Sequence, residues 1–292
     1  MIGNPGQLHF EHLEHDSALG SWSLTTARPL GALGSWVESL WIASSSDCYA
    51  QERILPRSTT MILFNLVPHP QYLEEGGGRR GFLTSWVSGL QQGPLEIFPS
   101  RQICNVGIQL RPSGALPVLG VPPSEVAGQV VDLDQLFGPG VEEVRMRMID
   151  EPSPRSRLLL LASALERRLT DPPRLRGEVL EALGVLHASR GKVPIHRLVR
   201  GSGWSERTFI QRFREQVGLN PKRYARVLRF ETAMTGLLGI ERVCWADFAV
   251  AHGWFDQAHM ARDFRELAGA TPLEVWRHQS PDGLSLLETE SR

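Results

Sequence analysis

The second half of the chain contains an internal repeat, and this repeat constrains the fold more than any other feature of the sequence. Groups of residues recur after 50 or 51 positions: Gly203-Trp204 as Gly253-Trp254, Phe213-Arg214-Glu215 as Phe264-Arg265-Glu266, Gly218 as Gly269 and Pro221 as Pro272. Such self-similarity indicates that one supersecondary unit occurs twice. Each copy reads as a short apolar helix, a turn with glycine, a second helix with a polar start, and then Gly and Pro. This order predicts two helix-turn-helix units.

Helical spacing of the apolar side chains predicts which face of each helix is buried. We expect the second helices of the two units at about 205–216 and 256–267, with Ser205 and Asp256 capping their first turns. The side chains expected to face inward are Ile195, Leu198, Val199, Phe209 and Phe213 in the first unit and Phe248, Ala249, Met260 and Phe264 in the second. This arrangement leaves a polar outer face on each second helix.

The outer faces carry side chains that suit the edges of DNA bases. They are Arg207, Ile210, Gln211 and Arg214 in the first unit, and Gln257, His259, Ala261 and Arg262 in the second. Arginine can bond to O6 and N7 of guanine, and glutamine to N6 and N7 of adenine. Ile210 or Ala261 suits a thymine methyl group. The alternative for any one such helix is an ordinary solvated charged face.

The segment between the two units predicts their spacing. Pro221 to about Leu238 reads as one helix of eighteen residues, or roughly 27 Å. With the loops added, the two second helices would lie about 34 Å apart, which is one turn of B-DNA. They would then enter successive major-groove faces on the same side of a duplex.

Charge is concentrated where such a partner would bind. The whole chain is nearly neutral, with 31 basic and 32 acidic residues. Residues 187–230 nevertheless hold eleven basic and two acidic residues, a net charge of +9, whereas residues 231–280 hold four basic and seven acidic, a net charge of −3. A basic block of this kind indicates a polyanionic partner. The acidic second unit is expected to attract phosphate more weakly than the first.

The first half of the chain predicts β structure, so that the whole chain is of the α+β class. Candidate strands at 36–42, 59–67, 81–89 and 102–110 are separated by Gly, Pro and Ser, which favours an antiparallel barrel, of the cupin-like kind, or a sandwich. A short helix is expected near 123–128. A small barrel can enclose a ligand cavity.

Breaks in composition divide the chain. We expect a flexible N-terminus at 1–19, a β-rich regulatory domain at 20–150, a linker at 151–176, a DNA-binding domain at 177–280 and a flexible tail at 281–292. The linker contains an amphipathic helix with Leu158, Leu161, Leu165 and Leu169 on one face. This face can pack on its own domain, which is the usual outcome, or pair with a second copy of the chain.

Two parts of the chain resemble a known family. Residues 193–277 are similar to the AraC/XylS family of bacterial transcription regulators through GSGWSERTFIQRFREQVGLNPKRYARVLRFETA and FAVAHGWFDQAHMARDFRELAGATPLEVW. Residues 20–138 resemble, less sharply, a barrel-like sensor domain found in part of that family, through ERILP, MILFN and VGIQLRPSGALPVLGVP. Phe255 departs from the family pattern, which usually has a small polar residue there.

The resemblance implies a cytoplasmic, DNA-binding transcription factor, often an activator, that acts without catalysis or a cofactor. Its first domain is expected to sense a small molecule or to mediate homodimerisation, and RNA polymerase is a further expected partner. The implied base readers are Arg207, Ile210, Gln211, Gln257, Ala258 and Arg262. The expected phosphate contacts are Arg200, Thr208, Arg214, Arg223, Arg226, Arg229 and His259.

Two other classes of function remain as alternatives. A cupin-like metalloenzyme would need a ligand cluster, and His69 is the only histidine between residues 20 and 150. His9, His12 and His15 could hold a metal, although they lie near the expected flexible end. A protein-interaction module would bind its partner with little dependence on salt, whereas a DNA reader loses affinity steeply as salt rises. No apolar run approaches the length of a membrane span.

Overall fold

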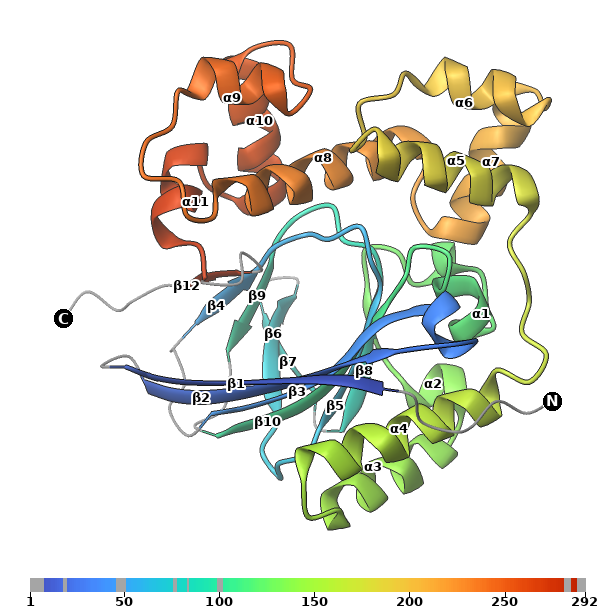
Figure 1. Ribbon diagram of the computed structural model, residues 1–292, viewed down its shortest axis with the longest axis vertical. Helices are drawn as coiled ribbons and strands as arrows, with labels where there is room; N and C mark the ends of the chain where they lie inside the picture. The colour runs from blue at the N-terminus through green and yellow to red at the C-terminus, as the bar shows by residue number, and fades with distance from the viewer. Residues whose placement is uncertain are drawn as a thin grey trace.

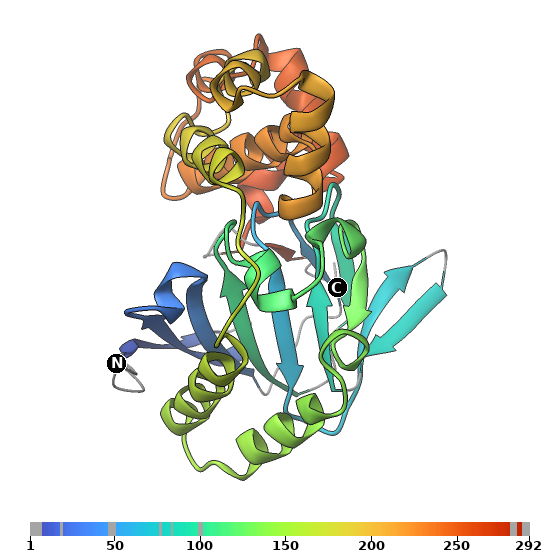
Figure 2. The same ribbon diagram turned by 90° about the vertical axis from the view of Figure 1, so that its right-hand side faces the viewer.

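The computed structural model describes residues 8–17, 20–45, 51–75, 78–82, 84–98, 102–280 and 285–287. Strands formed by the first half of the chain lie below a cluster of helices formed by the second half (Figures 1 and 2). The last described strand, β12, returns from the helices to the strands, so that the chain connects the two parts at more than one place.

The described strands form two antiparallel sheets. The larger has the order β1-β2-β3-β10-β5-β8-β11, and the smaller has the order β12-β4-β9-β6-β7. The strands are β1 (Leu8–Ser17), β2 (Gly20–Pro29), β3 (Val37–Ser45), β4 (Glu52–Ile54), β5 (Met61–Asn65), β6 (Gln71–Glu75), β7 (Gly78–Phe82), β8 (Ser85–Ser88), β9 (Leu95–Phe98), β10 (Ile103–Leu110), β11 (Val130–Asp132) and β12 (Ser285–Leu287).

The predicted antiparallel β region is confirmed, although its strands form these two sheets in place of one closed barrel. The strands expected at 36–42, 59–67 and 102–110 correspond to β3, β5 and β10. The strand expected at 81–89 is wrong as a single element, because the chain passes there from β7 in the smaller sheet to β8 in the larger one. The short helix expected near 123–128 is the 3-10 turn η2 (Pro123–Glu125).

Two segments that we expected to be flexible contain strands. Within 1–19, residues Leu8–Ser17 pair along their whole length with β2, and Leu8 and Phe10 pack against the core, while residues 1–7 and 18–19 lie outside the described part. Within 281–292, Ser285–Leu287 pair with β4, and Leu286 is buried, while the remaining residues lie outside the described part. Both pairings satisfy backbone groups that a free segment would leave to water.

The predicted linker helix is confirmed as α4 (Pro154–Arg168), and its leucines belong to the core of the β region. Leu158, Leu161, Leu165 and Leu169 are at most 7% exposed and share one cluster with Val106, Ile108 and Leu110 of β10. A capping box between Ser153 and Ser156 fixes the start of the helix. Of the two alternatives for this face, packing within the chain is therefore correct.

The remaining helices of the first half are α1 (Ala115–Leu119), α2 (Asp134–Phe137) and α3 (Gly140–Asp150), with the 3-10 turn η1 (Leu33–Ser35). The second half has α5 (Gly177–Ala188), α6 (Ile195–Ser202), α7 (Glu206–Val217), α8 (Pro221–Leu237), α9 (Trp245–Ala251), α10 (Gln257–Ala268) and α11 (Pro272–His278). None of these described helices combines the length and the hydrophobicity that a membrane span requires.

Candidate nucleic-acid interface

The first helix-turn-helix unit consists of α6 and α7 with Gly203 between them. Gly203 ends α6 in the left-handed conformation, with φ of +69°, which glycine adopts without steric cost. The side chain of Ser205 then accepts a hydrogen bond from the backbone N–H of Thr208, at 3.2 Å, and caps α7. Turn and cap together fix the direction in which α7 leaves α6.

The second unit consists of α9 and α10 and uses the same devices. Gly253 has a φ of +88°, and the side chain of Asp256 accepts a hydrogen bond from the backbone N–H of His259 at 2.7 Å. The second helices of the two units, expected at 205–216 and 256–267, thus correspond to α7 and α10 with their capping residues included. These two helices are called the recognition helices below.

The inner faces of both recognition helices are confirmed. Phe209 and Phe213 of α7, and Met260 and Phe264 of α10, are completely buried. Their contacts extend to α8, where Tyr224 and Phe230 pack edge-on against Phe213 and Phe264 respectively. The buried faces therefore fix how each recognition helix is rotated about its axis.

The predicted base-reading side chains lie on the opposite faces. Arg207, Gln211, Gln257, Ala258 and Arg262 are exposed, and Ile210 is half-buried. The amide of Gln211 donates to the Glu215 carboxylate at 2.9 Å. Each recognition helix thus presents arginine and glutamine donors to solvent from its first two turns.

One helix, α8, connects the two units. Asn220 caps it and Pro221 stands at its first position, where proline fits the helix without losing a hydrogen bond. At 17 residues the helix is about 26 Å long. The expected helix from Pro221 to about Leu238 is confirmed to within one residue.

The residues predicted to contact phosphate fall into two groups. Arg200, Thr208, Arg214 and Arg223 are exposed, and His259 is half-buried. The phosphate contacts of Arg226 and Arg229 stay a prediction, but both side chains are half-buried and lie within ion-pair distance of the carboxylate of Asp263. This follows from their place on the face of α8 that packs against α10, which sequence position alone did not reveal.

Asp263 of α10 organises this internal network. The residue is 6% exposed, and its carboxylate accepts hydrogen bonds from Arg226 Nε at 2.7 Å and from Trp254 Nε1 at 2.8 Å. Arg226 also binds the exposed Glu266. Arg229 Nη2 lies 4.0 Å from Asp263, and burial lowers the pKa of this guanidinium. The network holds the second unit against the connecting helix.

The outer face of α7 lies beside the β region. Ser124 of η2 and the side chains of Arg207, Ile210, Gln211, Arg214 and Glu215 line a groove of about 520 Å³. The carbonyl oxygen of Pro123 lies 3.4 Å from the position of a Cβ atom at Gly218, at the end of the same helix. The first recognition helix therefore has the β region as its neighbour.

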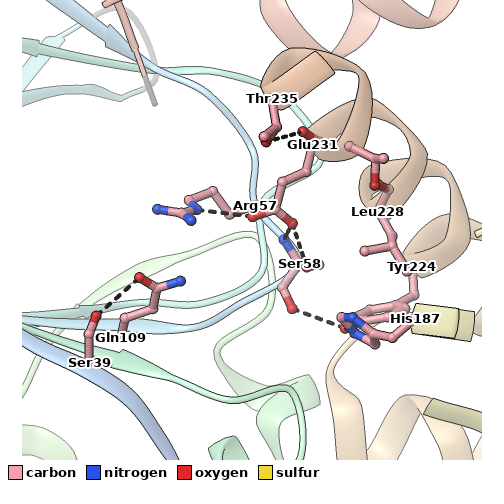
Figure 3. A network of polar contacts seen from close by, with 10 residues as sticks. Ser39, Arg57, Ser58, Gln109, His187, Tyr224, Leu228, Glu231 and Thr235 are labelled. Carbon is pink, nitrogen blue, oxygen red and sulfur yellow. Dashed lines mark hydrogen bonds and ion pairs between the residues drawn. The ribbon is translucent and has the colours of Figure 1, made fainter. Parts of the chain in front are cut away.

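A polar network joins the β region to α8 (Figure 3). The carboxylate of Glu231 accepts hydrogen bonds from the backbone N–H of Ser58 at 3.0 Å and from Arg57 Nε at 3.1 Å. The hydroxyl of Tyr224 donates to the carbonyl oxygen of Ser58 at 3.1 Å, and His187 Nε2 lies 2.8 Å from that hydroxyl. Leu55 and Leu90 of the β region also belong to the helical core.

A cavity of about 810 Å³ adjoins this network, between the β region and helices α5 and α8. Its ionisable lining residues are Glu38, Arg111, His187, Arg190, Glu231 and His252. Arg111 donates to Glu38 at 2.8 Å, so part of this charge is paired. Burial lowers the pKa of His187, against the opposing effects of Glu231 and Glu38, and burial likewise lowers the pKa of His252.

Of the three N-terminal histidines, the structure describes the side chains of His9 and His12, and that of His15 lies outside the described part. In β1 successive side chains point to opposite faces, so His9 and His12 lie on different sides of the sheet. Among the described side chains, no three histidine, cysteine or carboxylate groups lie close enough together to hold a metal ion.

Sequence reasoning missed Ser58, His187, Glu231 and Asp263. Glu231 and Asp263 interrupt otherwise basic or apolar helix faces, and this is the only signal that marks them in the sequence. Their partners lie up to 174 positions away, which no periodicity can indicate.

Comparison with known proteins agrees with this geometry. Residues 198–278 match the family described as helix-turn-helix domain, and residues 25–132 match the domain of unknown function DUF6597. No curated protein matches the chain.

Among solved structures, ToxT from Vibrio cholerae superimposes with a TM-score of 0.47 at 9% identity, covering 82% of this chain and 97% of that one. ToxT with bound unsaturated fatty acid gives a TM-score of 0.44 at 10% identity, covering 79% and 91%. Vicilin from hazelnut, Corylus avellana, gives 0.25 at 15% identity, covering 57% and 45%. These likenesses are too loose to carry an argument. Residues 198–278, with the two capped units that they contain, are thus identified as a helix-turn-helix domain, as the resemblance to the AraC/XylS regulators implies.

Proposed function

We propose that α7 and α10 enter successive major-groove faces on one side of a duplex. The observation that carries this proposal is the pair of recognition helices that bury one aromatic face each, expose Arg and Gln on the other, and are joined by the single helix α8. The base readers are Arg207, Ile210, Gln211, Gln257, Ala258 and Arg262. Arginine and glutamine supply directional hydrogen bonds to guanine and adenine.

Phosphate contacts come from Arg200, Thr208, Arg214, Arg223 and His259, which hold the register of the complex without reading sequence. The first unit supplies most of this attraction, because α6 through α7 (residues 195–217) carry five basic and two acidic residues, a net charge of +3. The corresponding span of the second unit (residues 245–268) carries two basic and four acidic residues, a net charge of −2.

We assign residues 20–150, together with α4, to regulation, and residues 177–280 to DNA binding. The cavity between the two parts suits a small-molecule effector, because a ligand there would touch α5 and α8 as well as the β region. Homodimerisation and contact with RNA polymerase belong to the same proposal, as does action in the cytoplasm, where the DNA is. The protein acts by binding, with no catalytic step.

Fluorescence anisotropy tests the proposal. The full chain is titrated against DNA from upstream of its own gene and against a scrambled duplex of equal length, across a salt series. We expect tighter binding to the upstream DNA and a steep loss of affinity with salt, because each neutralised phosphate releases counterions. Equal affinity for both duplexes that barely changes with salt would contradict a DNA-reading role and favour a protein-interaction module.

A further inference from the structure

Phe255 is the most exposed large apolar side chain among the described residues. Its exposed fraction is 88%, whereas the next, Val250, is 64% exposed. The residue lies in the turn of the second unit, directly before Asp256, which caps α10. An aromatic ring open to water at this position calls for a physical explanation.

The internal repeat shows that Phe255 is an additional residue. The first turn runs Gly203-Trp204-Ser205, with Ser205 as the cap, whereas the second runs Gly253-Trp254-Phe255-Asp256. The spacing between the units is therefore 50 before this point and 51 after it. Trp254 packs inward as the second-unit equivalent of Trp204, with 3% exposure and a hydrogen bond to Asp263.

Packing within the chain does not account for the ring of Phe255. An apolar residue just before a helix cap often packs against the fourth residue of the helix. That fourth residue is Met260, which is completely buried, while Phe255 stays exposed. The additional residue thus projects from the fold without stabilising it.

Its surroundings point to DNA as the partner. The first residues of a recognition helix reach the base edges, and Gln257 and Ala258 are exposed there beside Phe255. The second unit carries a net charge of −2 over residues 245–268, so it gains little from phosphate attraction. An apolar contact supplies affinity that does not depend on charge. The apolar group that the major groove offers is the C5-methyl group of thymine.

We propose that Phe255 is a specificity-determining residue whose ring packs against a thymine methyl group at the edge of the groove that α10 enters. The inference rests on the proposed docking of α10 in a major groove. It adds an aromatic contact with the base edge to the base readers Gln257, Ala258 and Arg262 of the second unit.

The test begins with a duplex selected from a random library by the full-length protein. Thymines in the half-site of the second unit are replaced one at a time by deoxyuridine, which lacks only the methyl group. Affinities are measured for the wild-type protein, Phe255→Ser and Phe255→Leu, with Leu13→Ser as the control, because Leu13 is 55% exposed on the distant strand β1. Since Phe255 is exposed, both substitutions are expected to leave the melting temperature unchanged.

We expect one deoxyuridine to weaken wild-type binding about fourfold, as burial of a single methyl group predicts. Phe255→Ser should weaken binding to the thymine duplex similarly and become indifferent to that deoxyuridine, with an unchanged salt slope. Phe255→Leu should retain most of the preference for thymine.

Equal sensitivity of the wild-type protein and Phe255→Ser to every deoxyuridine would overturn the proposal. A change in oligomeric state in Phe255→Ser, with DNA affinity intact, would also overturn it and assign the ring to a second copy of the chain. Failure of the wild-type protein to select any duplex is a different result: it would contradict the proposed function itself and, with it, this inference.

Discussion

Arg207 on α7 and Arg262 on α10 are exposed arginines on the faces that we assign to base reading. We expect Arg207→Ala and Arg262→Ala each to lower discrimination between the selected and a scrambled duplex, at a cost of roughly 1–3 kcal/mol for a lost bidentate contact. Competition anisotropy with the two duplexes measures the ratio of the two affinities for each variant.

The control for Arg207 is Arg212→Ala on the same helix. Arg212 is equally charged and exposed, but it turns to another face and lies 3.5 Å from Glu215. Its loss should weaken binding to both duplexes alike. If Arg207→Ala preserved the ratio as well as Arg212→Ala does, Arg207 would not be a base reader.

At the scale of the helices, the packing of α10 on α8 depends on Asp263. Asp263→Ala removes the acceptor of both Arg226 Nε and Trp254 Nε1, and leaving the buried indole N–H of Trp254 unpaired costs about 1–3 kcal/mol. Glu266→Ala removes an exposed partner of the same arginine and should cost less than about 1 kcal/mol. Urea unfolding of the two variants measures the difference. Equal destabilisation would show that Asp263 does not anchor the second unit.

The groove between η2 and α7 makes a second prediction at this scale. Ser124→Glu would bring a carboxylate close to Arg207 and Arg214 and to the expected path of the DNA. We expect weaker binding to all duplexes and a shallower salt slope, because fewer phosphates are neutralised. Ser124→Gln is the control, since it has nearly the same shape without the charge. Identical affinities for Glu and Gln would indicate that DNA does not approach α7 from the side of η2.

How much of these elements the sequence predicts depends on how far apart the interacting residues lie. The inward placement of Phe209 and Phe213 follows from their separation of four positions, and Ser205 and Asp256 were recognised as caps from local residue types. Arg226 looked like any exposed arginine of a basic helix, because its partner Asp263 lies 37 positions away. The strand β12 was missed for the same reason, since its partner β4 is more than 200 positions earlier in the chain.

At the scale of the whole molecule, several contacts connect the β region to the DNA-binding helices. Glu231 on α8 binds Ser58 and Arg57 (Figure 3). The side chains of Leu55 and Leu90 belong to the helical core, and β12 adds a strand to the smaller sheet. A conformational change in the cavity beside Glu231 would therefore be transmitted to α8, the helix that sets the distance between α7 and α10. This connection is what a regulator requires of its two parts.

The same junction makes folding stability depend on pH. Burial lowers the pKa of His187 below its ordinary value of 6.5, so the folded protein binds this proton less readily than the unfolded chain does. Stability is therefore complete above about pH 6.5 and declines as the pH falls through the interval between the ordinary and the lowered pKa. His252, with its pKa also lowered by burial, adds to the same slope.

We expect the melting temperature of the wild-type protein to fall between pH 7.5 and pH 5.5, and to fall less in His187→Gln, because glutamine can bond to the Tyr224 hydroxyl without taking up a proton. His196→Gln is the matched control, since His196 is exposed on α6 and its removal should leave the slope unchanged. Differential scanning fluorimetry at closely spaced pH values gives the curves. Parallel curves for the wild-type protein and His187→Gln would mean that protonation of His187 does not cause the loss of stability at low pH. A shallower slope in His187→Gln, but not in His196→Gln, would place the acid sensitivity where the two parts of the molecule meet.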